Sequence, residues 1–298
     1  MPFLTDPWDW WIEPFTGNPA MRNALVAVLL TAMCTAVVGT WVVLRGMSFL
    51  GDALAHGVLP GIAIAFVVGV DTTLGAFLAA LAMVGGVGLV RSASPLPADA
   101  SIGILFVGFL ALAVVVMSTQ QSSYTGDLTR FLFGSITGVD GADLTRQAIT
   151  TAVTAFGVTV LYRALLVGTF DPRQAKMLGL RPRLADASLL VLLAVAIVAS
   201  FSTVGNLLVF AFLVAPPATA TLVVRRVPAI MAAGAAIGAG CGTIGLLISY
   251  HRATAAGATM ALCTVVVFFG ALVVRSLVAA VGRARARSGG ARYAPGHG

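Results

Sequence analysis

The hydrophobic positions of this chain form long unbroken runs rather than an alternation of apolar and polar residues. Apolar runs of about 20 residues recur from Ala20 almost to the C-terminus, and each is long enough to cross a bilayer as a helix. Continuous runs disfavour a β-barrel, whose strands alternate. The pattern predicts an all-α polytopic membrane protein with about nine transmembrane helices (eight to ten). We place the spans at residues 20–45, 52–70, 73–91, 99–118, 142–165, 184–203, 206–224, 228–250 and 255–281.

The composition supports a membrane protein and excludes an ordinary soluble domain. Of the 298 residues, 59% are hydrophobic and 10% are charged, whereas a soluble domain carries about 25% charged residues. The three cysteines lie inside apolar runs without paired spacing, so we interpret them as small core residues. The sequence contains no phosphate-binding loop, zinc-protease motif or nucleophile elbow, so we expect a chain that is not an enzyme.

Arginines between the runs give the chain its net charge of +7, and their distribution predicts its orientation. Cytoplasmic segments of membrane proteins are enriched in lysine and arginine. This bias favours an N-terminus outside and a C-terminus in the cytoplasm, so the charge reflects topology rather than nucleic-acid binding. A short apolar segment at 131–139 is interpreted as re-entrant or interfacial. If this segment crossed the membrane, the N-terminus would lie on the cytoplasmic side instead. The basic residues left outside are Arg22, Arg130, Arg146 and Arg252.

The predicted topology divides the chain into three regions. Residues 1–19 form an acidic, aromatic extracytoplasmic segment whose tryptophans suit the membrane interface. Residues 20–282 form one transmembrane domain. Residues 283–298 are basic and then glycine-rich, and we expect them to form a disordered cytoplasmic tail that touches lipid headgroups.

The segment TFDPRQAKMLGLRPRL, between the fifth and sixth runs, predicts a short helix at about 171–179. An aspartate suits the N-cap, proline the first turn, and glycine the left-handed residue after the C-terminal end. The helix is too short to span a membrane, and it carries a charged and an apolar side. It is either a docking element for a cytoplasmic partner or a plain linker. The residues concerned are Asp171, Pro172, Arg173, Gln174, Lys176, Leu178 and Gly179.

Asp52 and His56 are the candidate functional pair, because ionisable groups within a membrane span are costly and often functional. Residues four apart share one face of a helix, and carboxylate with imidazole suits manganese, iron or zinc. A second copy of the chain would complete a set of four ligands, with Gly57, Pro60 and Gly61 permitting close approach. The alternative is that Asp52 caps the second span and His56 hydrogen-bonds within the bundle.

Four stretches together resemble the membrane permeases of ABC-type zinc and manganese importers. The resemblance covers most of residues 21–281, and the first stretch is the most specific. The stretches are VVLRGMSFLGDALAHGVLPGIAIAFVVG (42–69), LTRFLFGSITGVDGADL (128–144), FDPRQAKMLGLRPRLAD (170–186) and VGNLLVFAFLVAPPATATLV (204–223).

This resemblance implies a permease subunit in the bacterial cytoplasmic (inner) membrane, with an architecture like that of the vitamin B12 and siderophore permeases. It also implies a second copy of the chain, cytoplasmic ATP-binding subunits that use ATP, and an extracytoplasmic metal-binding protein. The helix at 171–179 then corresponds to the coupling helix that docks into the ATPase. Asp52 and His56 line a metal path that works by alternating access. No cofactor is bound permanently; manganese(II) or zinc(II) is the cargo, and the segment favours manganese.

Other interpretations remain open at the sequence level. A proton-coupled secondary metal transporter would use Asp52 and His56 as a proton relay, although no inverted repeat is evident. An intramembrane enzyme would need a motif that the sequence lacks. His251, on a predicted outer loop, is a further candidate for contact with arriving metal or its binding protein. Asn206 is interpreted as a helix cap.

Overall fold

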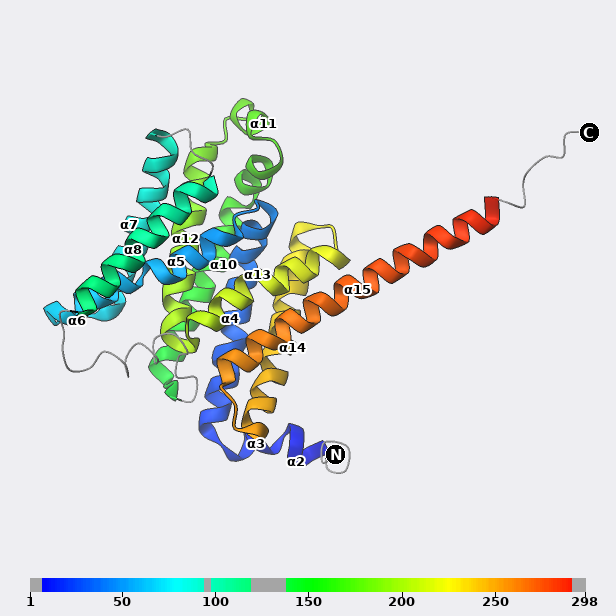
Figure 1. Cartoon of the computed structure of the whole chain (residues 1–298), viewed down its shortest axis with the longest axis horizontal. Coiled ribbons are helices and arrows are strands. Elements are labelled where there is room, and N and C mark those ends of the chain that lie inside the picture. Colours follow the sequence, from blue (N-terminus) through cyan, green and yellow to red (C-terminus); the bar gives the residue numbers. More distant parts are fainter. Residues whose placement is uncertain (1–6, 94–97, 119–137, 291–298) are drawn as a thin grey trace, which may run out of the picture.

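The computed structural model describes residues 7–93, 98–118 and 138–290, and within these ranges the chain forms helices and no strand (Figure 1). In this part of the chain, nine segments are long and apolar enough to cross a membrane. The predicted all-α class and span number are therefore confirmed. Most of the segment 131–139, interpreted as re-entrant or interfacial, lies outside the described residues.

The candidate spans follow the predicted order, and most of their bounds fall within a few residues of the predicted ones. Two short helices, α2 (Pro7–Trp11) and α3 (Glu13–Gly17), precede them, and α11 (Pro172–Met177) lies between the fifth and sixth. The spans are α4 (Pro19–Leu44), the pair α5 (Ser48–Gly57) and α6 (Leu59–Val68), α7 (Thr72–Ala93), α8 (Ala98–Ser118), α10 (Gly141–Phe170), α12 (Pro182–Val204), α13 (Asn206–Val223), α14 (Val227–Arg252) and α15 (Ala256–Gly290).

Local side-chain caps explain where several helices begin. The Asn18 side chain accepts a hydrogen bond from the Ala20 N–H at the start of α4. Asp140 and Asp143 form a reciprocal capping box at the start of α10. Before α7, the Asp71 carboxylate accepts the Leu74 N–H at 2.9 Å, and this backbone hydrogen bond lowers the pKa of Asp71. These caps satisfy backbone donors that a helix start leaves unpaired.

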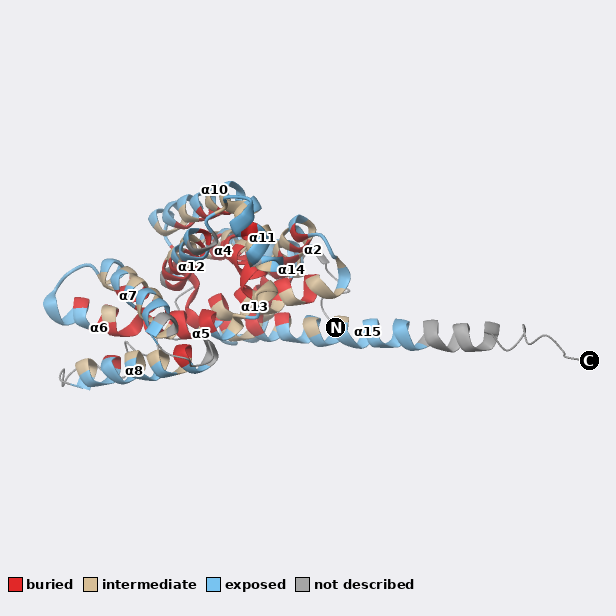
Figure 2. Cartoon of the chain, turned by 90° about the horizontal axis from the view of Figure 1, so that it is seen from above, coloured by how far each residue is buried: buried red, intermediate tan, exposed pale blue. Residues whose placement is uncertain are grey.

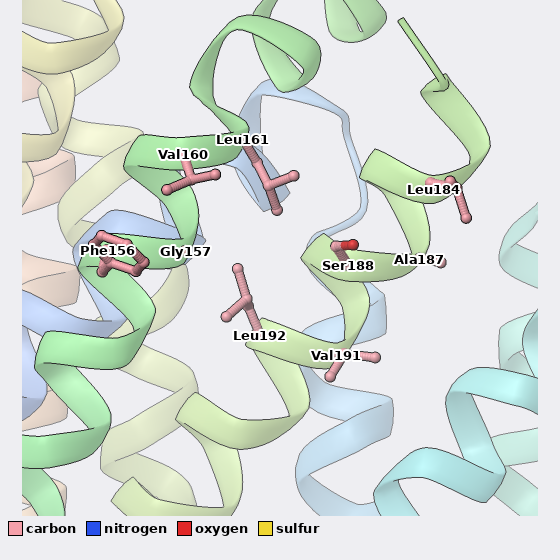
Figure 3. A pocket seen from close by; sticks show the side chains of 9 residues that line it. All are labelled: Phe156, Gly157, Val160, Leu161, Leu184, Ala187, Ser188, Val191 and Leu192. Carbon is pink, nitrogen blue, oxygen red and sulfur yellow. The ribbon is translucent and has the colours of Figure 1, made fainter.

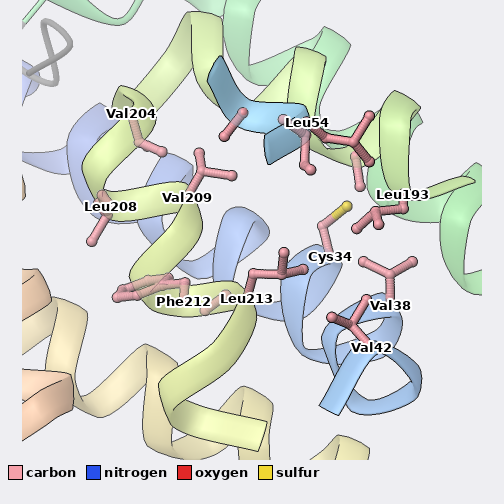
Figure 4. Close-up of a cluster of buried hydrophobic side chains, with 14 of the residues drawn as sticks. Cys34, Val38, Val42, Leu54, Leu193, Val204, Leu208, Val209, Phe212 and Leu213 are labelled. Carbon is pink, nitrogen blue, oxygen red and sulfur yellow. The ribbon is translucent and has the colours of Figure 1, made fainter. Parts of the chain in front are cut away.

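Helix α4 lies at the centre of the bundle and packs against α10, α12, α13 and α14. Trp41 on α4 and Phe212 on α13 are fully buried, and Figure 2 shows buried residues concentrated in these inner helices. Figure 4 shows side chains of α4, α5, α12 and α13 meeting in one apolar cluster. The backbones approach closely because Gly39 lies directly against the Leu213 carbonyl. Small residues at helix contacts allow such packing in membranes.

Helices α8, α10 and α15 expose broad apolar faces, including large side chains such as Val107, Phe156 and Val274. In Figure 2, α15 is exposed along most of its described length. Apolar surfaces of this extent are unusual on soluble monomers and fit contact with lipid or protein in a bilayer. The inner helices, such as α4 and α13, are thus mostly buried, whereas the outer helices α8, α10 and α15 are mostly exposed.

The boundary of the C-terminal tail differs from the prediction. Helix α15 continues beyond the apolar span to Gly290, so residues 283–290 are helical rather than disordered. The physical reason is that the sequence after the span alternates arginine with alanine, both strong helix formers, and the helix is already nucleated. Residues 291–298 of the expected tail lie outside the described residues.

Candidate metal path

Asp52 and His56 lie inside α5, which begins four residues before Asp52 with Met47 as its N-cap. The predicted start of this span at residue 52 was therefore too late, because Ser48 and Phe49 already belong to the helix. Asp52 is not a helix cap, so that part of the alternative is wrong. The other part, that His56 hydrogen-bonds within the bundle, agrees with its contact to the Asn206 side chain at 3.2 Å. The helical spacing places both side chains on one face of α5, as predicted.

The two side chains approach each other without closing into a tight ion pair. Asp52 Oδ1 and His56 Nε2 are 3.6 Å apart, and about a quarter of each side chain is exposed (28% and 26%). Two ligand atoms about 2.1 Å from one tetrahedral ion stand about 3.4 Å apart. The pair therefore has nearly the separation that a shared divalent ion requires, and it is partly exposed at the surface of the chain.

The helix breaks directly after His56. A residue at position 60 would normally donate its N–H to the His56 carbonyl, but Pro60 has none. The Val58 N–H donates to the His56 carbonyl instead, and α6 starts at Leu59. Interrupted helices of this kind mark binding sites in several classes of transporter.

The glycines near the break pack within the chain, which differs from the expected contact with a second copy. A side chain at Gly57 would meet Met83 of α7, and one at Gly61 would meet the backbone of Gly75, also on α7. These glycines hold α5 and α6 against α7. Any approach of a second copy to the metal pair must therefore use another face of α5.

Asn206 joins the pair from a distance of 150 residues in sequence. Its side-chain Nδ2 lies 3.2 Å from Nδ1 and 3.4 Å from Nε2 of His56. Gly205 is the N-cap of α13, and Asn206 makes no capping bond, so the interpretation as a cap is wrong. The residue is 4% exposed. Its only sequence signal was an amide at the edge of an apolar span.

One chain alone provides a small ligand set. Among the described residues, no group of three or more histidine, cysteine, aspartate or glutamate side chains comes together. A groove of about 440 Å³ between α10 and α12 is lined by apolar residues and Ser188, and it contains no ionisable group (Figure 3). The pair in α5, with Asn206, is therefore the candidate site.

The short helix α11 has the predicted caps. The Asp171 side chain accepts the N–H groups of Arg173 and Gln174 at 3.0 and 2.9 Å, and Gly179 has a left-handed φ of 70°. The helix has six residues, and one of them, Ala175, is buried against the bundle. Its exposed surface combines charged and apolar groups. They are Arg173, Gln174, Lys176, Met177 and Leu178.

Arg45 connects the helices on either side of α11. Its Nε donates to Thr169 on α10 at 3.0 Å, and its Nη1 contacts Asp186 on α12 at 2.6 Å. The residue itself caps the C-terminal end of α4, two residues before the N-cap of α5. This side chain therefore joins the surroundings of α11 to the start of the helix that carries Asp52.

His251 lies in the last turn of α14 rather than on a loop. Its ring stacks on Trp10 of α2 at a centroid distance of 4.7 Å, and its Nε2 lies 3.1 Å from the Trp10 carbonyl oxygen. The basic last turn of α14 favours a continued helix because cations are stabilised at helix C-termini. The described contacts give His251 a role in holding the N-terminal helices.

Two known proteins are similar to this chain over most of its length. The manganese transport system membrane protein MntC of Listeria innocua is 35% identical over 249 residues, which cover 84% of this chain and 88% of that protein. A Haemophilus influenzae membrane protein named for iron transport is 33% identical over 264 residues, covering 89% of this chain and 96% of that protein.

A solved structure has the same arrangement of helices. PsaBC from Streptococcus pneumoniae, in complex with a Fab, superposes with a TM-score of 0.79 at 30% identity, covering 88% of this chain and 94% of that one. The model of the ABC 3 transport family matches residues 18–275, which is most of the chain. This chain is therefore a member of the ABC 3 transport family, a multi-pass membrane permease.

Proposed function

We propose that this chain is the permease subunit of an ATP-driven importer that moves manganese(II) across the bacterial cytoplasmic membrane. Family membership favours an ABC-type importer over the proton-coupled secondary transporter. The observation that carries the choice of path is the pair Asp52 and His56, 3.6 Å apart and partly exposed at the surface of the chain, on an interrupted helix. The manganese assignment is supported by relatives named for manganese transport.

The site works best as half of a larger one. Each chain offers one carboxylate and one imidazole, and two copies related by a two-fold axis would offer two of each. Zinc accepts such a set in a tetrahedral site, while manganese adds water ligands. A permease must release what it binds, so a site that is completed only transiently suits transport better than a rigid cage.

Partner subunits supply the energy in this proposal. Cytoplasmic ATP-binding subunits dock on α11, through Arg173, Lys176 and the exposed apolar groups beside them. An extracytoplasmic binding protein delivers the metal to the opposite side. Closure of the ATPases moves α11 together with α10 and α12, and this motion alternates the access of Asp52 and His56 between the two sides.

The test is metal uptake into proteoliposomes that contain the full complex, with and without ATP, for manganese, zinc and iron separately. We expect ATP-dependent manganese uptake in the wild type and at least a tenfold loss in Asp52→Asn, because the amide is a far weaker metal ligand (about 1.4 kcal/mol per factor of ten). The matched control is Asp71→Asn, which removes an exposed carboxylate outside the spans and retains a capping side chain.

Each outcome decides a separate part of the proposal. Uptake driven by a proton gradient without ATP would contradict the importer assignment. ATP-dependent uptake that prefers zinc or iron would keep the importer and replace the metal. Unchanged uptake in Asp52→Asn would keep the importer and remove Asp52 from the path.

A further inference from the structure

We propose that the groove between α10 and α12 binds one anionic phospholipid, with an acyl chain between the helices and the phosphate at their α11 end. The groove has a volume of about 440 Å³, within the range of about 300–1,000 Å³ that ligand pockets have. It lies away from Asp52 and His56, and lipid binding itself does not depend on the proposed transport function.

The groove belongs to the part of α10 and α12 that crosses the membrane. Its lining runs from Phe156 to Leu161 on α10 and from Leu184 to Leu192 on α12, and both stretches lie inside candidate spans. Among these lining residues, Ser188 alone has a polar side chain. Phe156 and Leu184 are exposed, so the groove opens on the outside of the bundle. An apolar groove that faces the bilayer fits a hydrocarbon chain.

The two helices are held together on the side of the groove that is distant from α11. A Cβ at Gly157 would lie 3.0 Å from side-chain atoms of Leu192, so the helices touch there. Farther along, Gln147 Nε2 donates to Ser200 Oγ at 3.1 Å, and both residues are fully buried. Figure 3 shows the side chains of the two helices farther apart toward Leu184. An acyl chain can therefore enter between the helices from the α11 end.

Two exposed arginines flank the α11 end of the groove. Arg163 follows Val160 by three residues on α10. Arg181, the N-cap of α12, precedes Leu184 by three residues. Residues three apart are neighbours on a helix surface, so each arginine lies next to a lining residue. Within the described part of the chain, neither arginine belongs to an ion pair. Both charges are therefore free to hold an anion at the end of an apolar groove.

The chemistry of this end selects a phosphate. Arginine binds phosphate through two parallel hydrogen bonds, and its long side chain reaches the headgroup level from a membrane helix. The N-terminus of α12 lies at the same place without a side-chain cap, and a helix N-terminus favours an anion. Basic pockets between membrane helices bind anionic headgroups. A zwitterionic lipid would bring a positive choline group beside the arginines, so we expect it to bind more weakly.

The bound lipid has a consequence for transport, which, unlike the binding, rests on the proposed function. Helices α10 and α12 both continue into α11, the proposed contact with the ATPases. A lipid between them joins the two helices that move with α11. ATP-driven uptake should therefore depend on anionic lipid in the cytoplasmic leaflet.

The first test is native mass spectrometry of the purified full-length chain in detergent. Phosphatidylglycerol and phosphatidylcholine with identical acyl chains are added in separate titrations. We expect one phosphatidylglycerol to bind about tenfold more tightly than phosphatidylcholine, because two arginines each favour the anionic headgroup. Equal binding of the two lipids would overturn the proposal.

Two variants locate the binding site in this experiment. Arg163→Gln combined with Arg181→Gln should lower phosphatidylglycerol binding about tenfold and leave phosphatidylcholine unchanged, because it removes charge and leaves the groove. Ser188→Phe fills the groove and should weaken the binding of both lipids. The matched control, Arg146→Gln with Arg252→Gln, removes two exposed charges at the other end of α10 and at the end of α14. A preference that persists in the first double variant would place the lipid elsewhere and overturn the proposal.

Uptake into proteoliposomes that contain the full complex tests the consequence separately. We expect uptake by the wild type to rise severalfold when phosphatidylglycerol replaces part of the phosphatidylcholine, and the Arg163→Gln, Arg181→Gln variant to show no such rise. An equal rise in both would reveal an effect of bulk lipid charge and contradict the regulatory role. A chain that binds the lipid but imports no metal would contradict the proposed function alone. Cross-linking of two copies through Phe156→Cys would show that a second copy covers the groove and would overturn the lipid site.

Discussion

At the scale of single residues, Asp52 and His56 are close in sequence, whereas Asn206, which contacts His56, is 150 residues away. Asp52 and His56 are four residues apart, so any helix through them brings the side chains to one face. Pro60 also acts locally, because its missing N–H lies four residues after His56. Asn206 reaches the ring only through the packing of α13 against α5. No local pattern marks such a contact.

A glycine contact in the core provides a stability prediction at this scale. A Cβ at Gly39 would meet the backbone carbonyl of Leu213, which cannot move without shifting α13. We expect Gly39→Ala to lower the free energy of unfolding by about 1–3 kcal/mol, the usual cost of overpacking. The measurement is the thermal midpoint of the purified chain in detergent.

The control for this prediction is Gly85→Ala on α7, where an added Cβ meets nothing within 4 Å. Alanine favours a helix over glycine by about 1 kcal/mol, so the control should be neutral or stabilising. Equal midpoints for the two variants would show that α4 and α13 do not pack as closely as described.

At the scale of elements, α11 illustrates what local sequence can specify. Its N-cap, its first-turn proline and its C-terminal glycine are all encoded within nine residues, and the structure has each of them. The sequence left open whether this helix docks a partner or only connects two spans. The exposed charged and apolar surface beside the buried Ala175 supports docking of a partner.

Charge reversal on α11 tests the docking assignment. We expect Arg173→Glu combined with Lys176→Glu to reduce copurification of the ATP-binding subunits by at least tenfold, because two attractions become repulsions at an exposed surface. Arg252→Glu is the control, because Arg252 is the last residue of α14 and is predicted to lie on the outer side of the membrane. Full recovery of the ATP-binding subunits with the double variant would assign α11 to a plain linker.

The Arg45 contacts lead to a prediction about coupling. Arg45→Ala removes the bonds to Thr169 and Asp186, so motion of α10 and α12 should no longer reach the start of α5. We expect ATP hydrolysis to persist while metal uptake per ATP falls severalfold.

The exchange of the two charges, Arg45→Asp with Asp186→Arg, should restore part of the uptake if the ion pair transmits the motion. Uptake per ATP that stays at the wild-type value in Arg45→Ala would show that the link plays no part in transport. The double variant therefore shows whether the loss of uptake in Arg45→Ala comes from the missing ion pair or from the missing arginine side chain.

At the scale of the whole molecule, one chain holds only part of a metal site, and the proposed second copy completes it. Phe49, Asp52 and His56 share one stripe of α5, and Phe49 is 42% exposed. Phe106 of α8 contacts the rings of Phe49 and His56 on this stripe, so two facing copies would meet at the part of the stripe that α8 leaves exposed. The glycines of α5 and α6 do not contribute, because α7 covers them.

Cross-linking tests this arrangement. In a chain whose three native cysteines are replaced by serine, Phe49→Cys should form a disulfide between two copies under mild oxidation. Phe156→Cys, on the exposed face of α10, serves as the comparison and should remain monomeric. The proposed facing of two α5 helices would be contradicted by cross-linking at residue 156 alone.

The sequence by itself determined the all-α class, the number and order of the spans, the caps of α11 and the shared face of Asp52 and His56. Each of these depends on hydrophobic run length or on interactions within about one helical turn. The tertiary structure decided that Asp52 lies inside a helix, that Gly57 and Gly61 face α7, and that Asn206 and Arg45 reach partners more than 100 residues away. These features depend on which helix faces pack together, and in a chain that is apolar on nearly every face the hydrophobic pattern does not encode that choice.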